Sequence, residues 1–268
     1  MTKSAIYDYF KKQTDEIKIN FFRALVTYEE LPIHDLRVAV KRLRALIKFL
    51  KEQHISSPDA VSFIRQLNKI YKPLGHIRDL QIKTNLIRSF NNDDQEYFKE
   101  YVTALEKRQK WGRYKLQGSG STFYYSAFLK FNKHKPFCPV RKINLNHRKV
   151  ISERITRIRR HMRHENQELH LHQIRKRLKE IYYCMEMNGL EHIKIRSVNL
   201  DLSKIRKLED IIGKWRDTHL FEQTLQQDNP AFFNINEKGQ LQKIKNNIRR
   251  QNRKRFNYIS NQLTQTIS

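Results

Sequence analysis

The chain has 268 residues, of which 54 are Lys or Arg and 27 are Asp or Glu, so its formal net charge is +27. Apolar residues make up 38% of it, which excludes a fully disordered chain, and the scarcity of Gly and Pro argues against a many-turned β architecture. No glycine-rich phosphate loop occurs, and two cysteines are too few for a disulfide scaffold or a Cys-rich zinc site.

The chain also lacks the apolar segments that membrane contact requires. Its N-terminus has no apolar signal core, and no apolar run is long enough to span a bilayer, so we expect a cytoplasmic protein with no membrane partner. The large positive charge opposes compaction through self-repulsion, and acidic residues would serve solubility at least as well. The charge therefore favours a polyanionic partner, with a solubilising surface as the alternative.

Apolar residues recur at helical spacing along almost the whole chain, which predicts an all-α fold. The predicted helices cover 5–26, 33–51, 61–72, 76–90, 94–116, 122–134, 147–163, 169–187, 202–227 and 238–266. Predicted breaks lie where Ser, Asn, Gly and Pro gather, at 56–58, 91–94, 118–121, 136–139, 188–189 and 228–230, and also at Pro73. No segment alternates strictly enough to predict a strand, and 192–202 has the weakest helical pattern.

The sequence repeats itself at an offset of 138 residues. Nine of the 47 aligned pairs that begin at 34 and end at 80 are identical. Most of the identical residues are charged or His, whereas core positions such as Leu36 and Ile174 merely stay apolar. A repeat kept for folding alone would retain its apolar residues at least as strictly, so the repeat indicates a site. Two halves, about 1–137 and 138–268, predict two four-helix bundles related by a pseudo-twofold axis.

The segment 33–51 is predicted to carry an apolar stripe and a cationic stripe side by side. Ile33, Leu36 and Val40 open a series with the spacing of one helix face. The same spacing, shifted by one residue, selects only His, Arg and Lys: His34, Arg37, Lys41, Arg44 and Lys48. The second copy begins the same way, with His172, Arg175 and Lys179. Because a solvated face normally mixes both signs of charge, two matched stripes favour an anion-binding surface over ordinary exposed faces.

A second element is matched between the copies. The identical pairs are Lys69 with Lys207, Gly75 with Gly213, Arg78 with Arg216 and Asp79 with Asp217. Glycine inside a helix costs about 1 kcal/mol relative to Ala, so its recurrence predicts close helix packing or a helix junction. The two arginines would extend the cationic surface. Asp79 is the expected counter-charge of Arg37 or Lys41, with a simple helix-end salt bridge as the alternative.

The cationic stripe followed by the glycine element, occurring twice along the chain, resembles the CHAD family, the conserved histidine α-helical domain. The resemblance rests on the run His34-Asp35-Leu36-Arg37-Val38-Ala39-Val40-Lys41-Arg42-Leu43-Arg44, on the Gly75 element and on their second copies, and it covers nearly the whole chain. It implies one all-helical domain over 1–268, built from two four-helix bundles around a basic central channel. It also implies binding of inorganic polyphosphate. We expect this binding to involve no catalysis and no cofactor, in a cytoplasmic protein associated with polyphosphate granules.

The resemblance and the repeat together assign the binding residues. Those expected to bind polyphosphate are His34, Arg37, Lys41, Arg42, Arg44, Lys48, Lys69 and Arg78 in the first copy, and His172, Arg175, Lys179, Lys207 and Arg216 in the second. Asp79 and Asp217 are expected to position them, and no residue is assigned to catalysis. In the second copy Glu180 and Tyr182 stand where the first has Arg42 and Arg44, so we expect the second to hold its anion less tightly.

Two other functions and one other site are weighed against this assignment. A nucleic-acid-binding helical protein is the main alternative, favoured by the total charge and the basic run 249–255. A phosphate-chain hydrolase would need a carboxylate cluster for Mg²⁺, and none is found. His161, His164, His170 and His172 are close in sequence, but Arg159, Arg160 and Arg163 would repel a divalent cation, so no metal site is predicted.

Overall fold

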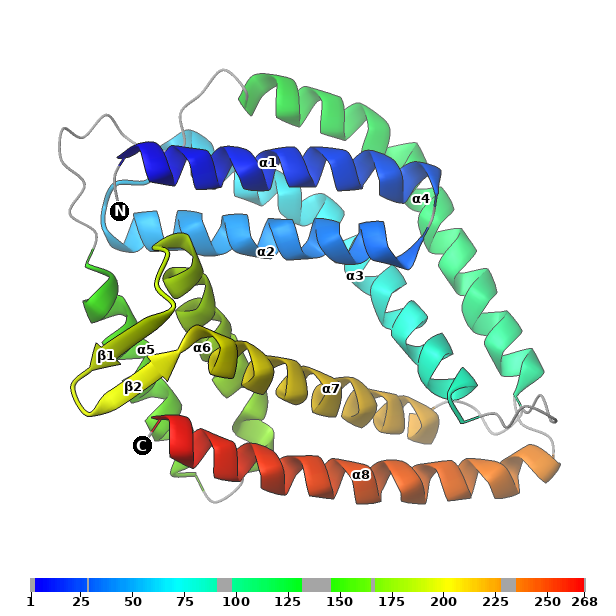
Figure 1. The fold of residues 1–268 in the computed structure, drawn as a ribbon. Coiled ribbons are helices and arrows are strands. Elements are labelled where there is room, and N and C mark those ends of the chain that lie inside the picture. The colour runs from blue at the N-terminus through cyan, green and yellow to red at the C-terminus, as the bar shows by residue number, and fades with distance from the viewer. Residues whose placement is uncertain are drawn as a thin grey trace. The chain divides into compact units, whose positions relative to one another are not determined.

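The computed structural model describes residues 3–27, 29–90, 98–131, 146–164, 167–227 and 235–267. Over this part of the chain the predicted all-α fold is confirmed, with one small hairpin in addition (Figure 1). The helices are α1 (Lys3–Val26), α2 (Glu30–Glu52), α3 (Pro58–Arg88), α4 (Lys99–Phe131), α5 (His147–Met162), α6 (Gln167–Met187), α7 (Leu202–Gln227) and α8 (Ile235–Ile267). None of the described helices combines the length and hydropathy needed to cross a bilayer.

The helices follow the 138-residue repeat along the chain. Adding 138 to the bounds of α2 or α3 gives a segment that overlaps α6 or α7 respectively, and α1 and α4 correspond to α5 and α8 in the same way. Contacts group the chain into two compact units, Met1–Ile82 with Ala104–Asn146, and Lys83–Thr103 with His147–Ser268. The four-helix order of each half is thus as predicted, while the single domain and the pseudo-twofold axis stay predictions.

The first unit is built around the apolar face of α2. α1 packs along α2 (Figure 1), and Phe21 of α1, Val40 of α2 and Leu74 of α3 border the same apolar gap. α4 joins them through Gly112, where an added Cβ would lie 3.1 Å from Ile77 of α3. The apolar positions predicted for α2 are all buried: Ile33, Leu36, Val40, Leu43, Ile47 and Leu50. The predicted stripe is therefore the core of this unit.

The second unit has the corresponding core. α6 packs against both α5 and α7, and α7 runs along α8 (Figure 1). The apolar residues predicted for α6 are buried, namely Leu171, Ile174, Leu178, Ile181 and Met185. Asp201 begins α7 as an N-cap, because its Oδ1 accepts a hydrogen bond from the Lys204 amide at 2.9 Å. This bond and one from the Ser203 hydroxyl, the larger cause, hold the pKa of Asp201 below its usual value.

Two predicted helix breaks are wrong, because the helices continue through them. α3 runs from Pro58 to Arg88 across Pro73 and Gly75, and α4 runs from Lys99 to Phe131 across 118–121. Proline removes only one backbone donor from the ladder, and the fully buried Leu74 and Ile77 beside it stabilise α3 by packing. Of the other predicted breaks, 56–58 and 188–189 are confirmed, and 91–94, 136–139 and 228–230 lie outside the described residues.

The weakly patterned segment 192–202 is a β-hairpin rather than a helix. β1 (His192–Ile195) pairs antiparallel with β2 (Val198–Asp201), and Ile195 lies opposite Val198 across a two-residue turn. Apolar residues alternate with polar ones in each strand, and the apolar ones are buried: Ile193, Ile195, Val198 and Leu200. The sequence contains this alternation, but each strand has only four residues. The turn between them also breaks the alternation, so the apolar positions of β2 do not continue the series of β1. β1 packs on α5, and β2 packs on α7 and α8.

Candidate functional site

The cationic residues predicted on α2 and α6 lie beside the buried apolar stripes. His34 and Arg44 are exposed on α2, and Arg37, Lys41, Arg42 and Lys48 are half-buried. On α6, His172 is exposed, and Arg175 and Lys179 are half-buried. Of the matched residues on α3 and α7, Lys69, Asp79 and Lys207 are exposed, and Arg78, Arg216 and Asp217 are half-buried. Each unit therefore holds its own set of predicted site residues.

In the first unit, Arg37 of α2 lies across the surface of α3. Its Nη1 donates a hydrogen bond to the backbone carbonyl of Tyr71 at 3.0 Å. Its Cζ lies 4.4 Å from the centre of the Tyr71 ring, and the Cζ of Arg44 lies 5.1 Å from the same ring. Tyr71 thus fixes two cations of the stripe through its carbonyl and the face of its ring, both of which attract positive charge.

Gly75 creates the space that Arg37 occupies. A Cβ placed on Gly75 would lie 2.8 Å from Nη1 of Arg37, closer than side chains tolerate. The arginine therefore approaches the backbone of α3 because the helix has no side chain at this position. The predicted role of the glycine was close helix packing or a helix junction, and the structure shows an arginine side chain packed on a continuous helix instead.

The second unit repeats this contact at the 138-residue offset. Arg175 Nε of α6 donates to the backbone carbonyl of Glu209 at 3.4 Å, and Glu209 is the counterpart of Tyr71. A Cβ on Gly213 would lie 2.8 Å from Nη2 of Arg175. Both copies thus position an arginine by the same device, a carbonyl that accepts from it and a glycine that leaves room for it. This contact gives a physical reason for the matched arginines and glycines.

The two copies differ in the side chain that accompanies the arginine. The Oε1 atom of Glu209 lies 2.8 Å from Nη2 of Arg175 and 2.9 Å from Nζ of Lys179. All three side chains are at most 22% exposed. Burial, followed by the charge of Arg175, lowers the pKa of Lys179, and Glu209 opposes this shift. In the second copy a carboxylate thus neutralises part of the stripe, where the first copy has a tyrosine.

His172 lies in a strongly positive part of the second copy. Burial is the largest cause that lowers its pKa below the usual histidine value, and the charges of Arg216, Arg175 and Lys176 lower it further. These charges show that the structure brings Arg216 of α7 and the cations of α6 within electrostatic reach of one imidazole. Within this unit, His172 thus feels the charges of both helices, and its role in binding stays a prediction.

The arginine that follows the glycine in the first copy pairs with a carboxylate at the start of α2. Arg78 Nη1 lies 2.9 Å from a carboxylate oxygen of Glu30, which begins α2. Asp79 is exposed, and within the described residues Arg37 is held by Tyr71 and not by this carboxylate. In the second copy the acidic partner of Arg175 is Glu209. Tyr71 and Glu209 are thus the described partners of the two arginines, and the positioning role of Asp79 and Asp217 stays a prediction.

The departure of the second copy at Glu180 has a packing reason. Arg154 of α5 is only 3% exposed at its side chain, and its Nε lies 2.8 Å from Oε2 of Glu180. Arg177 donates to both oxygens of the same carboxylate, at 3.1 and 3.0 Å. A buried guanidinium without a partner is strongly destabilising, so Glu180 stabilises this unit by pairing with Arg154. The position held by Arg42 in the first copy is therefore a core ion pair in the second.

Sequence reasoning missed Tyr71 and Glu209. Each lies 34 residues after its arginine and four before its glycine, so the spacing is conserved between the copies. Because the two residues differ in type, a search for identical pairs passes over them. The hydrogen bonds use their backbone carbonyls, which any residue provides.

Comparisons with known proteins agree with this fold. The family description of the CHAD domain matches residues 9–226 of the chain. The chain belongs to the CHAD family. Among curated proteins, none matches this CHAD protein in sequence. Solved structures that resemble its fold include PptA from Streptomyces chartreusis, with a TM-score of 0.71, 15% identity and 98% of each chain covered. They also include the CHAD domain from the plant Ricinus communis, with a TM-score of 0.69, 16% identity and 97% of this chain and 91% of that chain covered.

Proposed function

We propose that this CHAD protein binds inorganic polyphosphate, without catalysis, through the cationic stripes of α2 and α6. The observation that carries the proposal is the duplicated arginine contact, Arg37 over Gly75 and Arg175 over Gly213. A helix face that only confers solubility does not require an arginine fixed on a neighbouring backbone. Nor does it require the glycine that makes room for this arginine and that destabilises the helix relative to alanine. Membership of a family whose members are known as polyphosphate binders supports the same function.

Polyphosphate suits these residues chemically. It is a linear chain with about one negative charge per internal phosphate, and its oxygens only accept hydrogen bonds. An arginine offers several N–H donors in a flat fork, and a lysine adds a point charge. Within the described residues Arg37 uses one donor on the Tyr71 carbonyl, so the rest of the fork remains for a phosphate oxygen. Fixing the fork before binding lowers the entropy that the complex must lose.

The proposal extends to the architecture and the location. In it, the stripes of α2 and α6 line one basic channel in a single domain over residues 1–268, with the two halves related by a pseudo-twofold axis. Lys69, Arg78, Lys207 and Arg216 extend the cationic surface, and the protein acts in the cytoplasm at polyphosphate granules. Purified protein should release no orthophosphate from polyphosphate or ATP, with or without Mg²⁺.

Nucleic-acid binding is the second candidate, favoured by the net charge of +27 and by the exposed cations Arg253 and Lys254 on α8. The two candidates can be separated by competition. Long-chain polyphosphate and duplex DNA should be titrated against a labelled polyphosphate probe at equal phosphate concentration and one ionic strength. We expect polyphosphate to displace the probe at concentrations at least about 10-fold lower than DNA does, because a narrow chain can reach fixed arginines that a duplex cannot. Equal displacement would favour the nucleic-acid function.

A further inference from the structure

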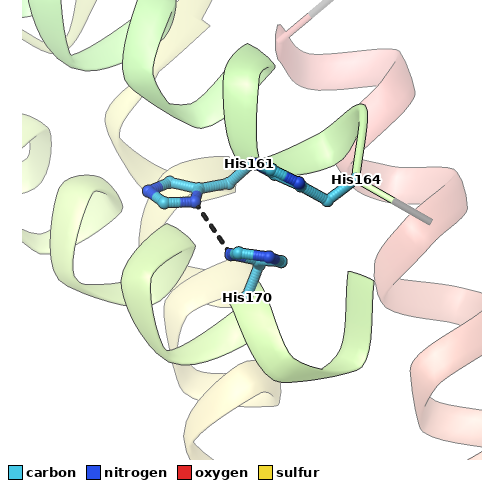
Figure 2. A group of neighbouring side chains, drawn as sticks. All are labelled: His161, His164 and His170. Atoms are coloured by element: carbon cyan, nitrogen blue, oxygen red, sulfur yellow. Dashed lines mark hydrogen bonds between the residues drawn. The ribbon is translucent and has the colours of Figure 1, made fainter. Parts of the chain in front are cut away.

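Three histidines gather where α5 ends and α6 begins, away from the cationic stripe of α6. His161 belongs to α5, His164 lies just after its end, and His170 lies in the first turn of α6 (Figure 2). One ring nitrogen from each histidine can be chosen so that the three nitrogens lie within 4.8 Å of one another. Nδ1 of His161 and Nδ1 of His170 are 3.1 Å apart, so one ring donates a proton to the other (Figure 2).

These distances are close to those of a metal site. In tetrahedral coordination with zinc–nitrogen bonds of about 2.0–2.1 Å, neighbouring ligand nitrogens lie about 3.3–3.5 Å apart. The ring of His164 is stacked on that of His170, with their centres 4.2 Å apart. A metal ion needs the in-plane lone pairs to converge, so His164 must rotate about its side-chain bonds to ligate. It is exposed and lies two residues beyond the end of α5, so no core packing opposes this rotation.

The arginines nearby give the site an unusual electrostatic setting. Sequence reasoning took them to exclude a metal, because they repel a divalent cation. In the structure they surround an open pocket of about 520 Å³, lined by Thr156, Arg159, Arg160, Arg163, His164 and Arg196. His164 belongs both to the histidine cluster and to this pocket. An anion in the pocket would lie beside a metal bound to the histidines. Its negative charge would offset the positive charge of the metal and that of the arginines.

We propose that His161, His164 and His170 bind a divalent transition-metal ion of the zinc class, and that a tetrahedral oxyanion in the adjoining arginine pocket supplies its counter-charge. Imidazole nitrogens suit Zn²⁺, and three histidines leave one coordination position open, which an anion oxygen can fill. Metal and anion then bind cooperatively, and each raises the affinity of the other by the same factor.

The metal site is tested by titrating Zn²⁺ into protein without a polyhistidine tag, in sodium chloride. Co²⁺ is titrated in parallel, because tetrahedral Co²⁺ has intense visible absorption. We expect one ion per chain, and at least about 100-fold weaker binding in His164→Gln, since loss of a mere outer-sphere partner costs 10–100-fold. The control His76→Gln, at an exposed residue of α3, should bind like the wild type. Equal affinities of wild type and His164→Gln would overturn the metal site.

The anion is tested by replacing chloride with sulfate at constant ionic strength, which avoids the precipitation of zinc phosphate. We expect sulfate to tighten Zn²⁺ binding at least about 5-fold, the lower end of ordinary coupling between two sites. Arg163→Gln should abolish this gain and, in chloride alone, should bind Zn²⁺ at least as tightly as the wild type, because one repelling charge is gone. A sulfate effect that persists in Arg163→Gln would overturn the assignment of the anion to the pocket. No polyphosphate is used, so these outcomes are independent of the proposed function.

Discussion

The two copies of the arginine contact share one scaffold and differ in charge at one position. In each, an arginine donates to a backbone carbonyl of the next helix and lies over a glycine four residues further on. Tyr71 presents a neutral ring to Arg37 and Arg44, whereas Glu209 presents a carboxylate to Arg175 and Lys179. The position of the arginine thus depends on backbone and glycine, and the local charge depends on one side chain.

This difference suggests that the copies contribute unequally to anion binding. An anion at the first copy meets an arginine whose described partners are neutral, but at the second it must share two cations with a carboxylate. Sequence reasoning also expected a weaker second copy, on the basis of Glu180 and Tyr182. The structure adds a second ground for this expectation, because the carboxylate of Glu209 pairs with Arg175 and Lys179 of the stripe, whereas Glu180 pairs with Arg154 and Arg177.

The largest expected effect comes from removing the cations of the first copy. Arg37→Gln with Lys41→Gln should weaken polyphosphate binding about 10- to 100-fold more than Arg253→Gln with Lys254→Gln, a difference of about 1.4–2.7 kcal/mol. Both pairs remove two charges, but only the first removes a cation fixed on a neighbouring helix. The affinities should be measured by titration at one salt concentration, after both variants are shown to melt cooperatively.

The equivalent change in the second copy sharpens this result. Arg175→Gln, Lys179→Gln and Glu209→Gln together remove two positive charges and one negative charge, so no carboxylate is left without its partners. We expect a loss of about 3- to 10-fold, smaller than that of the first copy, because the net charge falls by one only. A larger loss than at the first copy would reverse the inferred inequality between the two.

Gly75→Ala should separate binding from folding. A methyl group at this position displaces the guanidinium of Arg37, so polyphosphate affinity should fall about 10-fold. The free energy of unfolding should change little, because the helix gains about 1 kcal/mol from alanine and loses a similar amount with the Tyr71 hydrogen bond. The control is Gly239→Ala in α8, which meets no atom within 4 Å and should stabilise without altering affinity. Unchanged affinity in Gly75→Ala would contradict the role of the fixed arginine.

Exchanging the charge at position 71 or 209, where the two copies differ, should make their affinities for the anion more alike. Tyr71→Glu should weaken binding about 5-fold, and Glu209→Gln should strengthen it by a similar factor, because each changes the charge beside an arginine by one unit. Tyr71→Gln controls for the loss of the ring. Glu209→Gln should also lower the free energy of unfolding by about 1–2 kcal/mol, since two half-buried cations lose their counter-charge. Effects of the same sign from both exchanges would contradict this account.

The smallest expected effect is the pH dependence that His172 contributes to binding. Burial, the largest cause, and neighbouring cations hold the pKa of His172 below its usual value in the free protein. A bound polyanion raises the pKa, so binding takes up a proton and affinity should rise about 3-fold as the pH falls from about 7.5 to 5.5. His172→Gln should reduce this slope. A steeper rise in the variant than in the wild type would contradict it.

The same lowered pKa has a consequence for folding. The unfolded chain protonates His172 near the usual histidine value, whereas the folded chain does so only at lower pH. Stability should therefore fall as the pH drops below about 6.5 and level off below the lowered pKa. Denaturant titrations of the wild type and His172→Gln, over the same pH range, would measure this contribution by difference.

The sequence by itself determined the helices, their buried faces and the repeat. Apolar spacing is a local property, and the residues that it selects, such as Leu36 and Ile174, are buried in the structure. The offset of 138 residues also located the matched arginines and glycines. It did so because identical residues in two copies indicate a shared constraint even when the nature of the constraint is unknown.

Only the tertiary structure decided which residues accompany those arginines. The contact of Arg37 with Tyr71 joins residues 34 apart on α2 and α3, and the ion pair of Arg154 with Glu180 joins α5 to α6. Spacing along one helix places charges on a face, but it does not state which neighbouring helix covers that face. It is this packing that makes Tyr71 and Glu209 partners of the stripe, continues α3 past Pro73 and turns Glu180 into a core ion pair. The physical reason is that ion pairs and hydrogen bonds form over a few ångströms between elements, a distance that the order of residues does not record.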